Sequence, residues 1–285
     1  MGDAAQGEPI QHEVFTTPFK VEPHYEMWKT PNNYLMEPGG WRLPDRTKVW
    51  RVQNTGKEFG GVVSPKDAFD RFPDAEVLTV GFNVGKSNGS VGVGRHGNFF
   101  QWGFSGSPAQ MTDAGRAFFL NCICYIRKFD GKPPLVKREH LGRSYVPNLA
   151  AFTRFPADPK WPEQFFPADA LAKYGKDADD LIAYYRDNTE WIYLDRLFYV
   201  DEELKSAGIA SNRTVAALSA MVEMMKDPRK SELAGKFLGR YTTESFKTRE
   251  EWGDWLAANR GRIYFTDCGG YKFRVVPDGY LPPAR

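Results

Sequence analysis

Few residues in this 285-residue chain have the types and spacing that chemistry requires. The clearest polar group is Arg95-His96-Gly97-Asn98, which lies between two strand-like segments. An arginine beside a histidine favours the neutral imidazole, so His96 could act as a base while Arg95 clamps an anion. In the alternative interpretation Gly97 permits a bulge, Arg95 pairs with a carboxylate and His96 only forms a hydrogen bond. We assign no catalytic residue, and the candidate ligand-binding residues are Arg95, His96, Asn98 and Trp102.

Two other segments resemble functional motifs but lack an essential residue. Gly81–Ser87 has three residues between its glycines where a phosphate-binding loop needs four, and a strand rather than a helix follows, so it is predicted to be a turn. Cys268, in Thr-Asp-Cys-Gly-Gly, lacks the first glycine of a nucleophile elbow and is expected to be a free thiol in a hairpin turn. Cys122 and Cys124 point about 200° apart on a helix, so they cannot share a metal ion or form a disulfide with each other. Both are predicted to be core residues.

No metal site and no cofactor are predicted. The four histidines (His12, His24, His96 and His140) are scattered without the spacing of a zinc site. Asp177–Asp180 and Asp201–Glu203 lack the glycine and the bidentate glutamate of a calcium loop. These acidic runs are instead expected at helix starts, where negative charge offsets the helix dipole.

Composition excludes several classes of protein. Lys and Arg number 38 against 36 Asp and Glu, so there is no basic field for nucleic acid. The strongest apolar stretch, Ala117–Leu120, is cut by Asn121 and falls far short of the roughly 20 residues of a membrane helix. Met1–Lys20 lacks the pattern of a signal peptide, so the protein is expected to be soluble and cytoplasmic, or periplasmic if a signal peptide lies upstream of Met1. Aromatic residues reach 15%, a composition suited to loops packed down by rings.

The first half of the chain has α/β character. Residues 1–75 are rich in proline, and only Lys48–Gln53 alternates like a strand, so the rest is predicted to be loop. Glu76–Phe82 is predicted to be a buried strand, followed by the two strands that flank Arg95-His96-Gly97-Asn98. Thr112 is a helix N-cap, and the helix that it opens runs to about Lys128. Its middle is apolar on nearly all sides, which predicts burial rather than an exposed stripe.

The second half is predicted to be mainly helical. Prolines and aromatic residues mark 134–167 as a linker, and helices are expected over 168–187, 189–200 and 231–240 and after a cap at Asn212. Thr248 and Glu251 form a capping box. Two alternating segments about Cys268 predict a terminal hairpin. The predicted fold is an α/β module (1–133, with a partial or modified flavodoxin-like sheet), the linker (134–167) and a helical module ending in a β-hairpin (168–285).

One part of the chain resembles a known family. The runs D-A-E-V-L-T-V-G-F-N, V-G-V-G-R-H-G-N-F-F-Q-W-G-F and M-T-D-A-G-R-A-F-F-L-N-C-I-C-Y-I resemble the closing part of ThuA-like domains, which have the class I glutamine amidotransferase-like fold. His12-Glu13-Val14-Phe15 is similar to the family's H-P-I-F segment, with Glu13 in place of proline. In their details these runs resemble proteins of planctomycete-type bacteria. The segment around Glu251-Trp252 resembles a helix of HEAT-repeat proteins from such bacteria.

The departure from the family limits what the resemblance implies. The family's first strands and its nucleophile-elbow region have no counterpart, and G-x-C-x-G occurs nowhere in the chain. The chain is therefore either an N-terminally incomplete member or a non-catalytic descendant of the fold. The favoured hypothesis is a binding or assembly protein without catalysis, whose partner is a carbohydrate or a protein. The alternative is a ThuA-like hydrolase or isomerase that acts on a sugar, with Arg95 and His96 in its pocket.

Overall fold

The computed structural model describes residues 2–7, 11–30, 44–56, 63–66, 69, 72–82, 89–137, 140–155 and 158–280. The chain divides into two compact units. Unit 1 comprises residues 1–70 and 74–135, and unit 2 comprises 71–73 and 136–285. Gly81–Phe82 of the glycine-rich segment is described, whereas its predicted turn at 83–88 lies outside the described residues.

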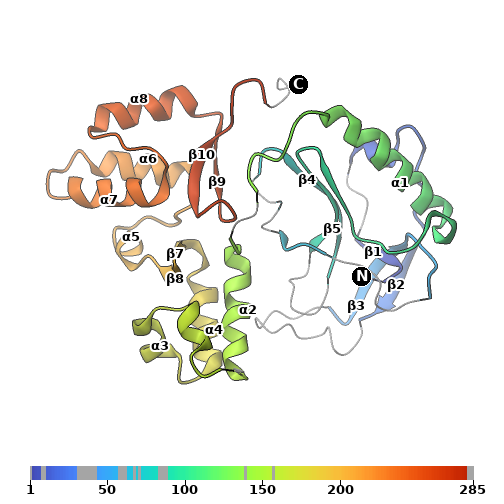
Figure 1. The fold of residues 1–285 in the computed structure, drawn as a ribbon, viewed down its shortest axis with the longest axis horizontal. Coiled ribbons are helices and arrows are strands. Elements are labelled where there is room, and N and C mark those ends of the chain that lie inside the picture. The colour runs from blue at the N-terminus through green and yellow to red at the C-terminus, as the bar shows by residue number, and fades with distance from the viewer. Residues whose placement is uncertain are drawn as a thin grey trace. The chain divides into compact units, whose positions relative to one another are not determined.

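Unit 1 is built on a curled six-stranded sheet in which every pairing is antiparallel (Figure 1). The spatial order is β2-β3-β1-β4-β5-β6. The α/β class is therefore confirmed, but the sheet differs from the parallel sheet of a flavodoxin-like fold. Eight residues join β4 to β5 and two join β5 to β6, whereas a parallel pair needs a crossover of a dozen or more residues. The strands are β1 Ala4–Gln6, β2 Tyr25–Lys29, β3 Arg46–Arg51, β4 Ala75–Gly81, β5 Ser90–His96 and β6 Phe99–Trp102.

Helix α1, Asp113–Ile126, packs its buried face on this sheet. The predicted cap is confirmed, since Thr112 Oγ1 accepts a hydrogen bond from the Gly115 amide at 3.0 Å. The same hydroxyl donates to the Arg51 carbonyl, which ties the start of the helix to the end of β3. Gly115 is required at this contact, because a Cβ there would lie 1.9 Å from the Val52 carbonyl oxygen. A glycine thus sets the approach of α1 to the sheet.

A buried amide fixes the loop that precedes β2. Asn121 on α1 is fully buried, and its Nδ2 donates to the carbonyls of Val14 and Phe19 at 2.9 and 2.7 Å. Its Oδ1 accepts from the Phe19 amide at 2.9 Å. Phe15 then stacks on Phe118 with ring centroids 4.8 Å apart, so the loop becomes part of the core of unit 1.

Unit 2 is mainly helical and ends in the predicted β-hairpin (Figure 1). One apolar core joins its helices to two small hairpins, β7–β8 and β9–β10. The predicted capping box is confirmed, since Thr248 Oγ1 accepts from the Glu251 amide and Glu251 accepts from the Thr248 amide. The elements are α2 Val146–Ala151, α3 Ala168–Tyr174, α4 Ala178–Asp187, β7 Ile192–Asp195, β8 Leu197–Val200, α5 Glu202–Ser206, α6 Val215–Met224, α7 Ser231–Tyr241, α8 Arg249–Asn259, β9 Ile263–Thr266 and β10 Lys272–Val275.

Several local predictions are wrong. The helix expected over 189–200 is a short 3-10 turn followed by β7 and β8, and helix α6 is capped by Thr214 rather than Asn212. Residues 1–75 contain two further strands, β1 and β2. The range expected to be a linker contributes α2 and Phe166 to the core of unit 2.

The outer face of α1 also departs from expectation. Leu120 and Ile123 are 40% and 47% exposed, so this helix is not buried on all sides. Cys124 is exposed, whereas Cys122 is a core residue as predicted. Asp177 and Asp201 do stand at helix starts, as the N-caps of α4 and α5.

Replacing Gly115 with alanine should destabilise unit 1 by about 3 kcal/mol or more, because the added Cβ has no space beside Val52. Urea unfolding monitored by hydrogen exchange at amides of β3 and α1 measures the effect. The matched control is Gly235→Ala in α7, where a Cβ meets no atom within 4 Å. That control should gain about 0.5–1 kcal/mol from helix propensity. Equal effects of the two changes would contradict the close-approach explanation.

Candidate functional site

The first group of interacting polar side chains lies in unit 1, around Glu76 on β4. Arg95, on the neighbouring strand β5, donates from Nε to Glu76 at 2.7 Å. Tyr125 on α1 donates its hydroxyl to both carboxylate oxygens, at 2.9 and 2.8 Å. His12 Nε2 lies 3.9 Å from Glu76, while its Nδ1 accepts from the Val14 amide. We call Glu76, Arg95, Tyr125 and His12 the Glu76 cluster.

The guanidinium of Arg95 is buried and contacts other residues of unit 1 on several sides. It is 4% exposed, its Nη1 donates to the Gly97 carbonyl at 2.8 Å, and its guanidinium lies 3.6 Å from the centre of the Phe129 ring. A carboxylate on one side and an aromatic face on the other satisfy a buried guanidinium. Arg95 therefore holds the sheet against the end of α1, as the alternative interpretation of the sequence predicts.

The charge states of Glu76 and Tyr125 are fixed at neutral pH. Burial opposes ionisation of Glu76, but its contacts with His12, Arg95 and Tyr125 outweigh burial and lower its pKa to about 2. Burial and the bonded carboxylate raise the pKa of Tyr125. An efficient general acid or base titrates near the working pH. Both groups are shifted away from that range, so the arrangement suits a structural or binding role.

His96 belongs to a different environment from Arg95. Successive strand residues point to opposite faces of a sheet, and the partners of the two side chains differ accordingly. His96 Nε2 lies 3.3 Å from Asp74, and its ring is 6.4 Å from the centre of the Phe69 ring. Burial raises the pKa of Asp74, but hydrogen bonds from His96 and from the Leu135 amide lower it overall. The structure therefore does not bring His96 and Arg95 into one pocket.

The other two predicted residues, Asn98 and Trp102, lie in the turn after β5 and at the end of β6. Trp102 packs its ring 5.6 Å from Phe118 and 4.9 Å from Phe119, both on α1. Asn98 occupies the turn between β5 and β6, next to Gly97 with φ of +56°. Within the described residues, the Asn98 Oδ1 and the Trp102 Nε1 are buried without a hydrogen-bond partner.

Sequence reasoning missed three of the four members of the Glu76 cluster. His12 was singled out only for its resemblance to a family segment, and Glu76 and Tyr125 only as parts of predicted elements. A signal did exist, because Glu76 is a charged residue in an otherwise apolar strand and requires a buried partner. Its partners Arg95 and Tyr125 lie 19 and 49 positions further along the chain, so the sequence alone does not identify them.

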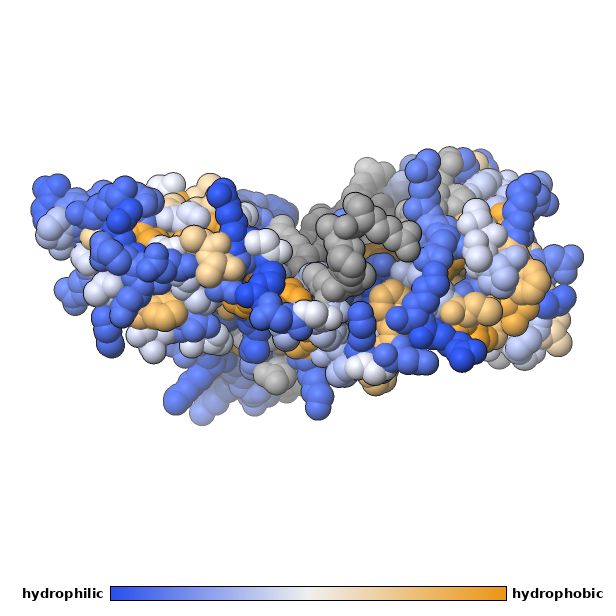
Figure 2. Space-filling model, turned by 90° about the horizontal axis from the view of Figure 1, so that it is seen from above, coloured by the Kyte–Doolittle hydropathy of each residue, from blue (hydrophilic) through white to orange (hydrophobic). Residues whose placement is uncertain are grey.

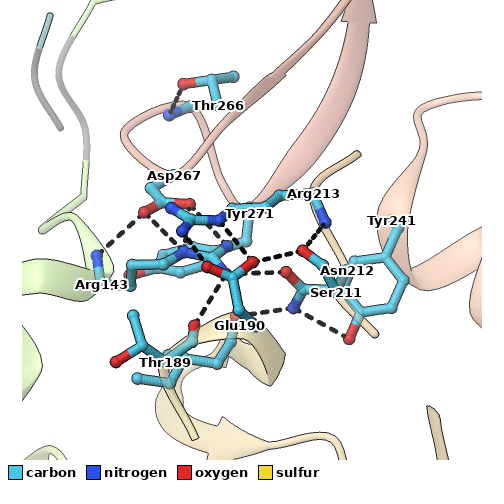
Figure 3. Close-up of polar contacts among 12 residues, drawn as sticks. Arg143, Thr189, Glu190, Ser211, Asn212, Arg213, Tyr241, Thr266, Asp267 and Tyr271 are labelled. Atoms are coloured by element: carbon cyan, nitrogen blue, oxygen red, sulfur yellow. Dashed lines mark hydrogen bonds and ion pairs between the residues drawn. The ribbon is translucent and has the colours of Figure 1, made fainter. Parts of the chain in front are cut away.

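The second polar group lies in unit 2, around the fully buried Arg143 (Figure 3). The guanidinium pairs with Asp267 through Nε and Nη2, the closest contact being 2.7 Å. Its Nη1 donates to the Thr189 carbonyl and to Asn212 Oδ1, at 3.0 and 2.9 Å. Burial opposes the charge on Arg143, but Asp267 raises its pKa overall. One cation thereby links the start of unit 2, its middle loops and the terminal hairpin.

The turn that Asp267 closes forms the floor of a pocket. The amides of Gly270 and Tyr271 both donate to the Asp267 carbonyl, and these two residues have φ of +97° and +57°. Residues from β7, α7 and the turn into β10 enclose a cavity of about 360 Å³, in the range of small-ligand sites. We call this cavity the Tyr193 pocket. It is lined by Tyr193, Leu194, Asp195, Lys236, Arg240, Gly270, Tyr271 and Lys272.

The charges around the Tyr193 pocket are largely balanced. Arg240 pairs with Asp201, and its guanidinium lies 4.5 Å from the centre of the Tyr193 ring. Lys236 pairs with Glu203 at 2.5 Å. Lys272 donates to the carbonyls of Gly239, Arg240 and Thr242 at the end of α7, where a cation offsets the helix dipole. The pocket therefore has no strong field that selects an anion.

Neither unit offers a site for metal chemistry in the described part of the chain, where no three His, Cys, Asp or Glu side chains come together. Cys268 is buried and lies in the turn of the terminal hairpin, where the sequence predicts it. The helices in the described ranges also lack the combination of length and apolar character that a bilayer requires.

Replacing Glu76 with glutamine should destabilise unit 1 by about 2 kcal/mol at pH 7, because the buried Arg95 loses its counter-charge. The folded-state pKa of Glu76 is lowered from 4.5 to about 2. The carboxylate therefore stabilises the fold above pH 4.5, and the difference between wild type and variant should shrink as the pH falls from 4.5 toward 2. Hydrogen exchange at β5 amides measures this difference in the free energy of unfolding. Glu22→Gln, which changes an exposed carboxylate, is the control and should be nearly neutral.

Replacing Arg143 with methionine should destabilise unit 2 by about 3–5 kcal/mol, because Asp267 is left as a buried unpaired charge. The double change Arg143→Met/Asp267→Leu should recover most of the loss. Urea unfolding followed by amide exchange in α6 measures both variants. A double variant no more stable than the single one would contradict this assignment.

Comparison of the chain with protein-family models, curated proteins and solved structures finds no match. The resemblance to ThuA-like domains stays a prediction that rests on the quoted sequence runs. The two polar groups and the Tyr193 pocket are the observations from which a function has to be inferred.

Proposed function

We propose that this chain is a binding protein without catalytic activity, and that its ligand is a small neutral carbohydrate held in the Tyr193 pocket. The observation that carries the proposal is a cavity of about 360 Å³ that combines tyrosine walls with paired charges. Aromatic rings pack against the apolar C–H faces of a sugar, and tyrosine adds a polar tip. Charged side chains with balanced partners supply hydrogen bonds to hydroxyls without attracting an anion.

The pocket offers both kinds of group. Tyr193 stacks with Tyr199 at a centroid distance of 5.4 Å, which fixes an aromatic wall. Asp195, at the exposed end of β7, contributes a carboxylate that accepts hydrogen bonds from hydroxyl groups. Lys236 on α7 is half exposed and contributes donors. Convergent polar groups on an aromatic wall are typical of a site that orients a small ligand.

Binding is favoured over the hydrolase alternative by the state of the Glu76 cluster. Sugar hydrolysis requires a carboxyl group that can give or take a proton near neutral pH. Glu76, with a pKa of about 2, is held as a carboxylate by Arg95 and Tyr125. The lowered pKa of Asp74 beside His96 supports the same conclusion.

A protein partner is a second candidate, because unit 2 also exposes aromatic rings. Phe155 is 89% exposed and Phe152 is 47% exposed. Trp161 lies 6.2 Å from Phe152 and 4.7 Å from Phe165 by ring centroids. Aromatic residues at the surface are typical of contact patches between proteins. This surface would be used for assembly rather than for a small ligand.

Titration of the chain with a panel of neutral mono- and disaccharides, followed by NMR shifts and calorimetry, tests the proposal. At least one sugar should bind saturably, and Tyr193→Ala or Asp195→Ala should weaken it about tenfold or more. Asp254→Ala, which removes an exposed carboxylate of α8, is the matched control and should leave binding unchanged. His96→Ala should also leave it unchanged.

Three outcomes would count against a carbohydrate in this pocket. The first is no saturable binding to any sugar in the panel. The second is binding that survives Tyr193→Ala and is lost in Phe155→Ala, which would favour the exposed aromatic surface. The third is turnover of a sugar that is lost in His96→Ala with the fold intact, which would favour the hydrolase alternative.

A further inference from the structure

Helix α1 carries an exposed face that mixes apolar and charged residues. The exposed positions recur three or four residues apart, so they share one side of the helix, opposite the side that packs on the sheet. Leu120 and Ile123 lie in the middle of this face. In Figure 2, seen from the side on which α1 lies in Figure 1, orange side chains lie among blue ones over unit 1. The α1 outer face consists of Asp113, Arg116, Leu120, Ile123, Cys124 and Arg127.

The residues on this face are arranged so that two antiparallel copies of α1 would place opposite charges against each other. Asp113 precedes Leu120 by seven residues, and Arg127 follows it by seven. Arg116 and Cys124 are likewise four residues before and after Leu120. If a second α1 lies antiparallel with the two Leu120 side chains in contact, each Asp113 stands opposite an Arg127. A two-fold axis produces such reciprocal contacts.

The charges at the two ends are available for this pairing. Asp113 is fully exposed, and its ion pair with Arg116, the one it makes among the described residues, is long at 3.4 Å. Arg127 is exposed and makes no hydrogen bond or ion pair through its side chain with the described part of the chain. Lys128 beside it is already paired with Glu13. Antiparallel helices also bring opposite ends of their dipoles together.

We propose that a second copy of this chain docks on the α1 outer face, antiparallel and centred on Leu120, to form a two-fold symmetric dimer. A contact of one helix and its flank is small, so the dimer belongs to the weak class of interfaces. The proposal is independent of the ligand in the Tyr193 pocket.

A disulfide trap tests the register. Cys124 and the Cys124 of the second copy are offset by eight residues, or about 12 Å along the helix, too far for a disulfide. Position 116 of one copy and Cys124 of the other lie opposite each other. Arg116→Cys should therefore form a covalent dimer under mild oxidation, through 116–124 links identified by mass spectrometry. Wild type and the control Arg116→Cys/Cys124→Ser should stay uncrosslinked.

A charge exchange tests the pairing without a new bond. In sedimentation velocity from about 5 to 200 µM, Asp113→Lys alone and Arg127→Glu alone should each dimerise about tenfold more weakly than wild type, because each places like charges together. An equimolar mixture of the two variants should recover the wild-type affinity, since both ion pairs are restored in the mixed dimer. Leu120→Asp should abolish association, and Phe99→Asp, which changes an exposed ring of β6, should not.

The proposal is overturned if the wild-type chain stays monomeric across that range. It is also overturned if Leu120→Asp weakens the dimer no more than Phe99→Asp does, or if the mixture of charge variants associates no more tightly than either variant alone. Should Arg116→Cys fail to fold, as judged by circular dichroism, the charge exchange decides the register by itself.

Discussion

Unit 2 depends on a single buried cation, Arg143. Removing a guanidinium from water is costly, and only a matching carboxylate with further acceptors offsets the cost. Asp267, the Thr189 carbonyl and Asn212 meet that requirement from three separate segments. Because Asp267 also closes the turn through Gly270 and Tyr271, the constraint on Arg143 extends to the floor of the Tyr193 pocket. The pocket is held in shape by a residue that does not line it.

The two units use charge in the same manner. In unit 1 the carboxylate of Glu76 satisfies Arg95 and Tyr125, and in unit 2 Asp267 satisfies Arg143. The guanidinium of each pair is buried, and the contacts lower the pKa of Glu76 and raise that of Arg143. Such pairs fix the positions of neighbouring strands and helices rather than exchanging protons. In the Tyr193 pocket Arg240 and Lys236 are likewise paired, with Asp201 and Glu203, which agrees with the proposed binding role.

Sequence reasoning was reliable where the determining interactions are local. The cap at Thr112, the box at Thr248 and the terminal hairpin each depend on residues a few positions apart, and all three are confirmed. The fold class follows from these elements. The misses have non-local causes. Strand β1 has three residues and exists through pairing with β3, which lies more than 40 positions away. The turn between β7 and β8 has Arg196 at φ of +60°, where a glycine is usual. Without that glycine the sequence gives no signal for this hairpin.

The hydrogen bonds of Asn121 determine which positions of this sequence can vary among relatives. Its side-chain amide offers a donor and an acceptor in the arrangement of a peptide group, so α1 gives the loop at 14–19 the hydrogen bonds that a neighbouring strand would give. The loop needs no particular side chain for these bonds, because it contributes only its backbone. Thr16 and Thr17 are exposed and free to vary. Among relatives of this chain, the invariant position for the loop should therefore lie about a hundred residues away, within a helix.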